Sequence, residues 1–156
     1  MTSISYVENP AVENTDLNSL FENAWPDHMW RDFKLVLQHS LVYVCAFDGT
    51  RLIGFVNVAW DGGFHAFILD TTVHREFQHR GVGLRLVAEA TRVAASRGVE
   101  WLHVDFEPEL EEFYQKAGFL HTTAGLQRLP SSNLTLHCTG RQFRCAQLPP
   151  VSLTDR

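Results

Sequence analysis

One short stretch constrains the fold more than any other part of this chain. Residues 78–83, with the sequence QHRGVG, follow an apolar run that ends at Val73 and precede a segment of helical spacing from Leu84 to Arg97. The pattern predicts a strand, a tight glycine turn and a helix N-terminus in succession. Such a junction gathers unpaired backbone N–H groups and the positive end of a helix dipole at one point. The sequence therefore predicts a site for a phosphate or pyrophosphate group there.

The composition indicates one globular domain without a general affinity for polyanions. The chain has 156 residues, of which 45% are hydrophobic and 20% charged, and its formal net charge is −5. These fractions are typical of a globular protein with a substantial core. The acidic balance predicts no nucleic-acid partner and no attraction to anionic membranes. Any anion site on this chain must therefore be local.

We expect neither a secretion signal nor a membrane-spanning segment. Residues 1–5 are polar, and no apolar run approaches the roughly 20 residues needed to cross a bilayer. The predicted location is the cytoplasm. The three cysteines lack CxxC spacing and the eight histidines are dispersed, so no metal site is expected.

The first half of the chain predicts two helices followed by an antiparallel meander. Residues before about 14 show little periodicity and fit a loop or a short edge strand. Apolar residues at helical spacing mark helices over about 15–24 and 27–40, and Trp30 lies on the apolar stripe of the second, where we expect it in the core. Short Gly-containing turns then join three strand-like runs, which favours hairpins. These runs are residues 41–47, 51–60 and 64–73.

The second half alternates between helix and strand patterns. A helix over 82–97 leads to a strand that must run parallel to the third, because a helix connects the two. The expected elements are the helix 82–97, the strand 101–106, a short helix 108–117 and a strand 119–129. We expect residues 1–129 to form a single domain. Residues 130–156 are predicted to be a tail with an edge strand at 133–138 and otherwise irregular structure.

Two motifs, in this order of elements, resemble those of a known family. Residues 78–83 match the signature [RQ]-x-x-G-x-[GA], and residues 113–119, FYQKAGF, match a later Tyr-x-x-x-Gly-Phe segment. Together they resemble the GNAT superfamily of acyl-coenzyme-A-dependent N-acetyltransferases. The resemblance implies an α/β (α+β) GNAT fold. It has a mixed sheet, an antiparallel meander, splayed parallel strands at the cofactor site and flanking helices.

The resemblance also implies acetyl-CoA or coenzyme A as cosubstrate, lying between the diverging ends of the strands that finish near Val73 and Phe106. The Val73 backbone would pair with the pantetheine amides, and the N–H groups that follow would hold the pyrophosphate. Glycine at 81 and 83 would let the phosphate approach the backbone. The implied cofactor-binding residues are Val73, Gln78, His79, Arg80, Gly81, Val82, Gly83 and Leu84.

Tyr114 stands where the family places its general acid. Its hydroxyl could give a proton to the departing thiolate, although it also lies on the apolar face of its helix and could simply pack. A base must take a proton from the ammonium form of the acceptor. Asp70 is the first candidate, as base or as an anchor for the ammonium group. His103, Asp105 and a water relay are the alternatives.

One residue departs from the family pattern. Seven residues before the tyrosine, where the family often has a cofactor-contacting asparagine, this chain has Glu107. A carboxylate cannot donate to the pantetheine, so it is either a second acidic group near the reaction centre or a solvated residue at a helix start. Trp25 and Trp60 are candidates for the acceptor pocket. His103, Asp105 and Glu107 are further ones.

The predicted function is acetyl transfer from acetyl-CoA to a primary amine of a small molecule, protein or peptide. A non-catalytic acyl-CoA-binding module is the alternative, and an interaction domain without cofactor is a third. A homodimer is an open alternative to a monomer.

Overall fold

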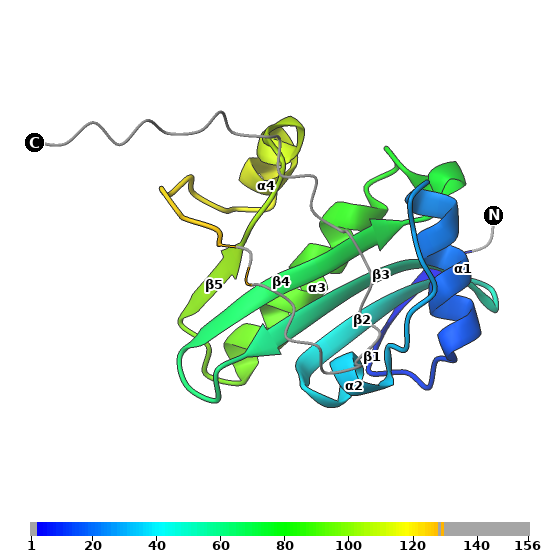
Figure 1. Ribbon diagram of the computed structural model, residues 1–156, viewed down its shortest axis with the longest axis horizontal. Helices are drawn as coiled ribbons and strands as arrows, with labels where there is room; N and C mark the ends of the chain where they lie inside the picture. The colour runs from blue at the N-terminus through cyan, green and yellow to red at the C-terminus, as the bar shows by residue number, and fades with distance from the viewer. Residues whose placement is uncertain (1–2, 128, 130–156) are drawn as a thin grey trace, which may run out of the picture.

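A five-stranded mixed sheet with the order β1-β2-β3-β4-β5 forms the centre of the protein (Figure 1). The structure, a computed structural model, describes residues 3–127 and 129. The first three pairings are antiparallel and the last, between β4 and β5, is parallel. The strands are β1 (Ile4–Glu8), β2 (Ser40–Asp48), β3 (Arg51–Trp60), β4 (His65–Val73) and β5 (Trp101–Val104). The predicted meander and the parallel crossover are thus confirmed, and the N-terminal segment supplies the edge strand.

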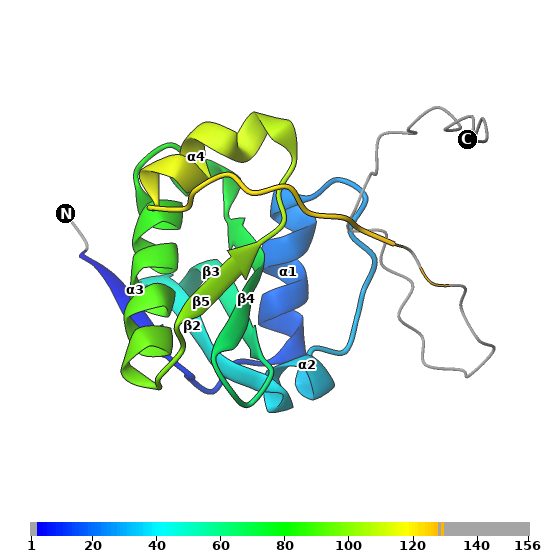
Figure 2. The ribbon, with the colours of Figure 1, turned by 90° about the vertical axis from the view of Figure 1, so that its left-hand side faces the viewer.

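Helices lie on both faces of this sheet, so that α1 and α3 sit on opposite sides of it (Figure 2). Val42, Val58 and Leu86 belong to the apolar core between the sheet and α3. Leu17, Phe21 and Phe55 belong to a second core on the α1 side. The helices are α1 (Asn14–Ala24), α2 (Lys34–Gln38), α3 (Val82–Ser96) and α4 (Glu111–Lys116), with short 3₁₀ turns at Arg75–Phe77 and Pro108–Leu110. Within the described residues, no helix has the length and apolar character to span a membrane.

Gly54 on β3 lets α3 approach the sheet closely. A Cβ atom at this position would lie 2.8 Å from Leu86 Cδ1 and 3.3 Å from Ala46 Cβ. We expect Gly54→Ala to lower the free energy of unfolding by about 1–3 kcal/mol, because overpacking outweighs the lower backbone entropy of alanine. Urea denaturation would measure this, with Gly125→Ala as the control because a Cβ there meets nothing within 4 Å. Equal stabilities of the two variants would contradict the close packing.

The second predicted helix is much shorter than expected, and Trp30 is not in the core. Helical structure covers only Lys34–Gln38, and Trp30 is 65% exposed. Two side chains of α1 explain the difference, because they hydrogen-bond backbone groups that a helix would otherwise use. Asn18 accepts from the Arg31 N–H at 2.9 Å and donates to the Arg31 carbonyl at 2.9 Å, and Asn14 Oδ1 accepts from the Phe33 N–H at 2.9 Å.

The strand predicted over 119–129 is also absent. Residues 119–127 and 129 have no strand structure, and Leu120, Leu126 and Leu129 are strongly exposed. An alternating sequence forms a strand only where a neighbouring strand satisfies its backbone groups. No described strand pairs with this segment. The edge strand predicted at 133–138, like the rest of 130–156, lies outside the described residues.

Candidate active site

Strands β4 and β5 separate halfway along β4. Their parallel pairing runs from His65 opposite Trp101 to Ile68 opposite Val104. β5 ends at Val104, whereas β4 continues to Val73. The second half of β4 therefore has no β5 partner, and its backbone groups on that edge can serve a ligand. The helix α4 lies beyond the end of β5, on the far side of this opening (Figure 1).

A bulge interrupts β4 at the start of its unpaired half. Asn57 of β3 faces Leu69 and Phe55 faces Thr72, so two β4 residues, Asp70 and Thr71, stand opposite one β3 residue. Asp70 has the left-handed φ of +57°, which is uncommon for a residue other than glycine. Bulges redirect side chains. This one turns Asp70 away from the simple alternation of the strand.

The backbone of Val73 faces the open edge. The next residue, His74, donates its N–H to the Ile53 carbonyl of β3 at 2.9 Å. Because successive residues of a strand point their backbone groups to opposite sides, those of Val73 point away from β3. The Gln78 side chain donates to the Val73 carbonyl at 3.0 Å. An amide group of the protein therefore already reaches this carbonyl from the open edge.

The turn before α3 leaves three helix-start N–H groups for an anion. Arg85 is the first residue of α3 to find a backbone acceptor, the Gly81 carbonyl at 3.0 Å. The N–H groups of Val82, Gly83 and Leu84 precede it and have no acceptor four residues back within the helix. Gly81 has φ +80° and ψ 0°, and a Cβ there would point into open space. The turn therefore presents backbone donors and a helix dipole to an accessible surface, as an anion site requires.

Gly83 has a second reason to be glycine, besides the predicted approach of a phosphate, which stays a prediction. A Cβ atom on Gly83 would come within 3.1 Å of the Phe113 ring of α4. The missing side chain lets α4 pack against the start of α3. Gly83 thus also permits a close approach between two protein elements.

Tyr114 is buried beside the opening between β4 and β5. It is only 5% exposed. Its ring stacks on Phe106 at 4.9 Å between centroids and meets Phe113 and Phe119 edge-on. Burial raises the pKa of the Tyr114 hydroxyl, and the nearby Thr71 lowers that pKa by a smaller amount. The hydroxyl therefore stays protonated at neutral pH.

Thr71 connects Tyr114 with the bulge of β4. Its Oγ1 atom is buried and has no hydrogen-bond partner among the described residues. A buried hydroxyl in that state is unusual. The pKa effect of Thr71 on Tyr114 shows that the two side chains are neighbours, although their contact is not a hydrogen bond of ordinary geometry. The structure thus brings Tyr114 to the open half of β4.

Asp70 forms an ion pair with Arg31 from the loop between α1 and α2. Arg31 Nη2 lies 2.7 Å from Asp70 Oδ2, and both side chains are largely buried. The Arg31 guanidinium also stacks on the Phe33 ring, at 4.2 Å from its centroid. In the same loop, the Trp25 indole donates to Thr72 Oγ1 at 3.2 Å. The loop therefore closes over the end of β4, and it brings Trp25 close to Asp70.

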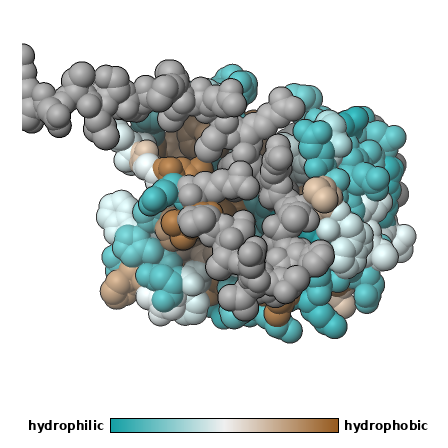
Figure 3. Space-filling view, viewed as in Figure 1, coloured by the Kyte–Doolittle hydropathy of each residue, from teal (hydrophilic) through white to brown (hydrophobic). Residues whose placement is uncertain are grey.

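The remaining predicted residues lie farther from this group. Trp60 pairs with Ala66 near the start of β4, and its indole donates to the Gly63 carbonyl at 2.9 Å. His103 stacks on Phe67 and hydrogen-bonds His65 at 2.9 Å on the exposed face of the sheet. Phe67 contributes to the exposed apolar surface of β4, and apolar atoms are visible in the left half of Figure 3.

Two acidic candidates follow β5 and are exposed. Asp105 lies between β5 and the 3₁₀ turn Pro108–Leu110, and Glu107 is the residue that caps this turn. Glu107 makes no side-chain capping hydrogen bond. Its exposure fits the interpretation as a solvated residue at a helix start.

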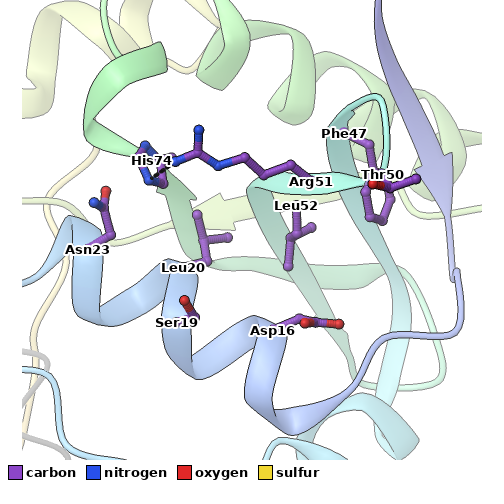
Figure 4. A pocket seen from close by; sticks show the side chains of 9 residues that line it. All are labelled: Asp16, Ser19, Leu20, Asn23, Phe47, Thr50, Arg51, Leu52 and His74. Atoms are coloured by element: carbon purple, nitrogen blue, oxygen red, sulfur yellow. Dashed lines mark hydrogen bonds between the residues drawn. The ribbon is translucent and has the colours of Figure 1, made fainter.

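A separate cavity of about 290 Å³ lies between α1 and the β2–β3 turn (Figure 4). It includes His74, in the loop that leads to the turn and helix start of residues 78–84, which we call the cradle. None of the predicted site residues lines it. Its lining residues are Asp16, Ser19, Leu20, Asn23, Phe47, Thr50, Arg51, Leu52 and His74.

Two residues of the site were missed from the sequence, Arg31 and Thr71. Arg31 lies in a loop with no motif and meets Asp70 only through the fold. Thr71 had a signal, because the polar run of residues 70–72 interrupts an otherwise apolar strand. Such a run indicates a bulge or a site.

Strands β4 and β5 thus part beside a helix start that is suited to an anion, and comparison with known proteins places this arrangement in a family. The model of the Acetyltransferase (GNAT) family matches residues 12–119. The chain therefore belongs to the GNAT family. This confirms the resemblance seen in the sequence.

The chain is similar to several members of this family. It is 27% identical over 107 residues to the uncharacterized N-acetyltransferase ycf52 of Porphyra purpurea. The aligned residues make up 66% of this chain and 62% of that protein. A solved structure of a probable acetyltransferase from Staphylococcus aureus has 20% identity and a TM-score of 0.68, covering 83% of this chain and 100% of the other. The aminoglycoside N-acetyltransferase AAC(6')-Iy, solved in complex with CoA, has 20% identity and a TM-score of 0.68, covering 83% and 96%.

Proposed function

We propose that this protein transfers an acetyl group from acetyl-CoA to a primary amine. The observation that carries the proposal is the spatial arrangement of three features at one opening. These are the unpaired second half of β4, the free N–H groups at the start of α3, and the buried Tyr114 beside them.

Acetyl-CoA fits these features. Its pantetheine amides would hydrogen-bond the edge of β4 at Val73, and its pyrophosphate would accept from the N–H groups between His79 and Leu84. The open space at Gly81 and the side-chain amide of Gln78, which already reaches the β4 edge, are consistent with this placement. The CoA complex of AAC(6')-Iy supports a CoA ligand in this fold.

The chemistry needs a proton donor at the thioester and a proton acceptor at the amine. Acetyl-CoA supplies a thioester carbonyl, which a neutral amine attacks to form the C–N bond as the C–S bond breaks. The Tyr114 hydroxyl gives its proton to the departing sulfur. Its raised pKa keeps that proton in place until the thiolate forms. Tyr114 therefore acts as the general acid.

The amine must lose a proton before or during attack, and Asp70 is the first candidate to help. Its carboxylate lies at the bulge, two residues before Thr72. The Trp25 indole donates a hydrogen bond to Thr72. Its ion pair with Arg31 keeps a carboxylate in a largely buried place, where it could anchor an ammonium group or accept its proton. His103 on β5 and Asp105, which follows this strand, are more exposed. A water relay would have to carry the proton from the amine to either of them.

We expect Asp70→Asn to lower kcat/KM for the amine about 10²-fold, at the lower end of the range for general acid–base residues. Arg31→Gln breaks the same ion pair and leaves the carboxylate in place, so its loss should stay below about tenfold if the carboxylate itself matters. Steady-state kinetics with varied amine would measure both. Equal losses in the two variants would show that Asp70 serves only to hold Arg31.

The function is tested by thiol release. Purified protein, acetyl-CoA and a panel of amines, both small molecules and peptides with free amino groups, should release CoA thiol at a rate that depends on the amine. Stabilisation by acetyl-CoA in a thermal shift experiment without turnover on any amine would favour the binding module. No stabilisation at millimolar acetyl-CoA would refute the proposal.

A further inference from the structure

Arg51 lies at the start of β3 and reaches into the loop that leads to the cradle. Its Nη2 is 2.7 Å from His74 Nε2 and its Nη1 is 3.0 Å from Glu76 Oε2. Its guanidinium carbon lies 5.8 Å from the centroid of the Phe77 ring. Figure 4 shows the Arg51 side chain running from β3 to His74, at the rim of the α1 cavity. The guanidinium is thus fixed beside the 3₁₀ turn Arg75–Phe77 that precedes the cradle.

A second guanidinium flanks the same ring. The Arg80 guanidinium carbon lies 5.4 Å from the Phe77 centroid. Arg80 belongs to the turn whose next residues supply the free N–H groups. In a chain of net charge −5, these two cations form a local positive surface on one side of the cradle. An anion bound near the turn would meet both.

The imidazole of His74 faces two donors, one from Arg51 and one from the Glu76 backbone. The Glu76 N–H points at His74 Nδ1 at 3.3 Å, while Arg51 Nη2 points at Nε2 at 2.7 Å. A neutral imidazole has one acceptor nitrogen, so one of these donors faces an N–H group. Burial, and then the nearby Arg51, lower the pKa of His74, which keeps the ring neutral. The contacts of Arg51 with His74 and Glu76 use two of the five N–H donors of its guanidinium, so this side chain can also donate to an anion.

Coenzyme A carries an anion suited to this position. Besides its pyrophosphate it has a phosphate on the 3′-hydroxyl of its ribose, a few bonds away. The helix-start N–H groups can serve the pyrophosphate, but they leave the third phosphate without a partner. Arg51 has a 52% exposed side chain, so a ligand can reach it, and its present partner Glu76 is even more exposed. Guanidinium groups bind phosphate oxygens through two parallel N–H donors.

Resting on the proposed function, we infer that Arg51, together with Arg80, binds the 3′-phosphate of coenzyme A. The pair therefore makes the site prefer coenzyme A to dephospho-coenzyme A. Glu76 competes for Arg51 in the free protein. It would release the guanidinium when the phosphate arrives.

Calorimetric titration of the full chain with coenzyme A and with dephospho-coenzyme A tests this inference. We expect the wild type to bind coenzyme A about tenfold more tightly, as for one charge-assisted contact at a partly exposed site. Arg51→Gln should weaken coenzyme A binding about tenfold and leave dephospho-coenzyme A binding unchanged. Glu76→Gln should increase the preference, because it removes a competing carboxylate. A merely structural role of Arg51 would weaken both ligands alike.

Arg92→Gln is the matched control. Arg92 lies on α3, where it pairs with Glu8 of β1 and Glu89 of α3. Its replacement removes one positive charge and none of the contacts of the cradle. It should leave the preference unchanged. If the ratio of the two Kd values, for coenzyme A and dephospho-coenzyme A, were the same in the wild type and in Arg51→Gln, the inference would be overturned. The proposed function would not be affected. Absence of binding of either ligand to the wild type would overturn the proposed function and the inference with it.

Discussion

Tyr114→Phe should lower kcat by about 10²–10³-fold while the affinity for acetyl-CoA changes little. The substitution removes one oxygen from a side chain that is otherwise packed among the rings of Phe106, Phe113 and Phe119, so the fold should persist. Loss of a general acid typically costs a factor of 10²–10⁴, and water can partly replace it as a proton donor. Steady-state thiol release and calorimetric titration with CoA would separate the two effects.

Tyr43→Phe is the matched control for this variant. Tyr43 is also partly buried, and burial raises its pKa. It lies on β2, away from the β4–β5 opening, and its hydroxyl donates to the Pro10 carbonyl at 2.8 Å. Its replacement should cost about 1 kcal/mol of stability without changing kcat. If Tyr114 is the acid, the wild type should also lose kcat at alkaline pH, above the ordinary tyrosine range, as the hydroxyl ionises. An unchanged kcat in Tyr114→Phe would remove Tyr114 from the mechanism.

Gly81→Glu should abolish the stabilisation of the protein by CoA. The position has a left-handed φ that side chains disfavour, and a glutamate there would place bulk and negative charge where the pyrophosphate approaches. At 100 times its Kd, a ligand stabilises a protein by about 2.7 kcal/mol. In a domain of this size that raises Tm by about 5–10 °C. In Gly81→Glu, CoA should raise Tm by less than about 1 °C.

Gly98→Glu separates backbone strain from loss of the site. Gly98 follows the other end of α3 with φ +87°, and a Cβ there also meets nothing within 4 Å. Both variants should lose stability by the strain of a side chain at positive φ, about 1–2 kcal/mol. Only Gly98→Glu should keep the CoA-dependent rise in Tm. A full rise in Gly81→Glu would place the phosphate site elsewhere.

The cradle could be predicted from the sequence because its geometry is local. A strand, a glycine turn and a helix start follow one another within residues 73–84, so neighbouring residues determine where the N–H groups of the turn point. The meander was predicted for the same reason, since short turns between strand-like runs leave few topologies.

The parts of the site that depend on distant contacts could not be predicted. Asp70 meets Arg31, and Thr71 meets Tyr114, only after the sheet and the loops have formed. The bulge at Asp70 arises from the register of β3 against β4. The polar run of residues 70–72 indicates a break in the strand, but it does not give the direction of the Asp70 side chain. The bulge has a large effect on where the following side chains of β4 point, because one extra residue moves a side chain to the other face of the sheet.

Trp30 illustrates a different cause of error. Its apolar character and helical spacing predicted a core position, but Asn14 and Asn18 of α1 hydrogen-bond the backbone of the loop, and Trp30 is exposed. Side-chain hydrogen bonds to the backbone, made by two polar residues far from the loop in sequence, outweighed the hydrophobic pattern.

Titration of ¹⁵N-labelled protein with coenzyme A tests the central claim most directly. The amide signals of Val82, Gly83 and Leu84 should move most, because their free N–H groups would donate hydrogen bonds to the pyrophosphate. Signals from the α1 cavity, such as those of Ser19 and Asn23, should move little. The account would be contradicted if the three cradle signals stayed in place at millimolar coenzyme A, or if the largest changes occurred at the α1 cavity.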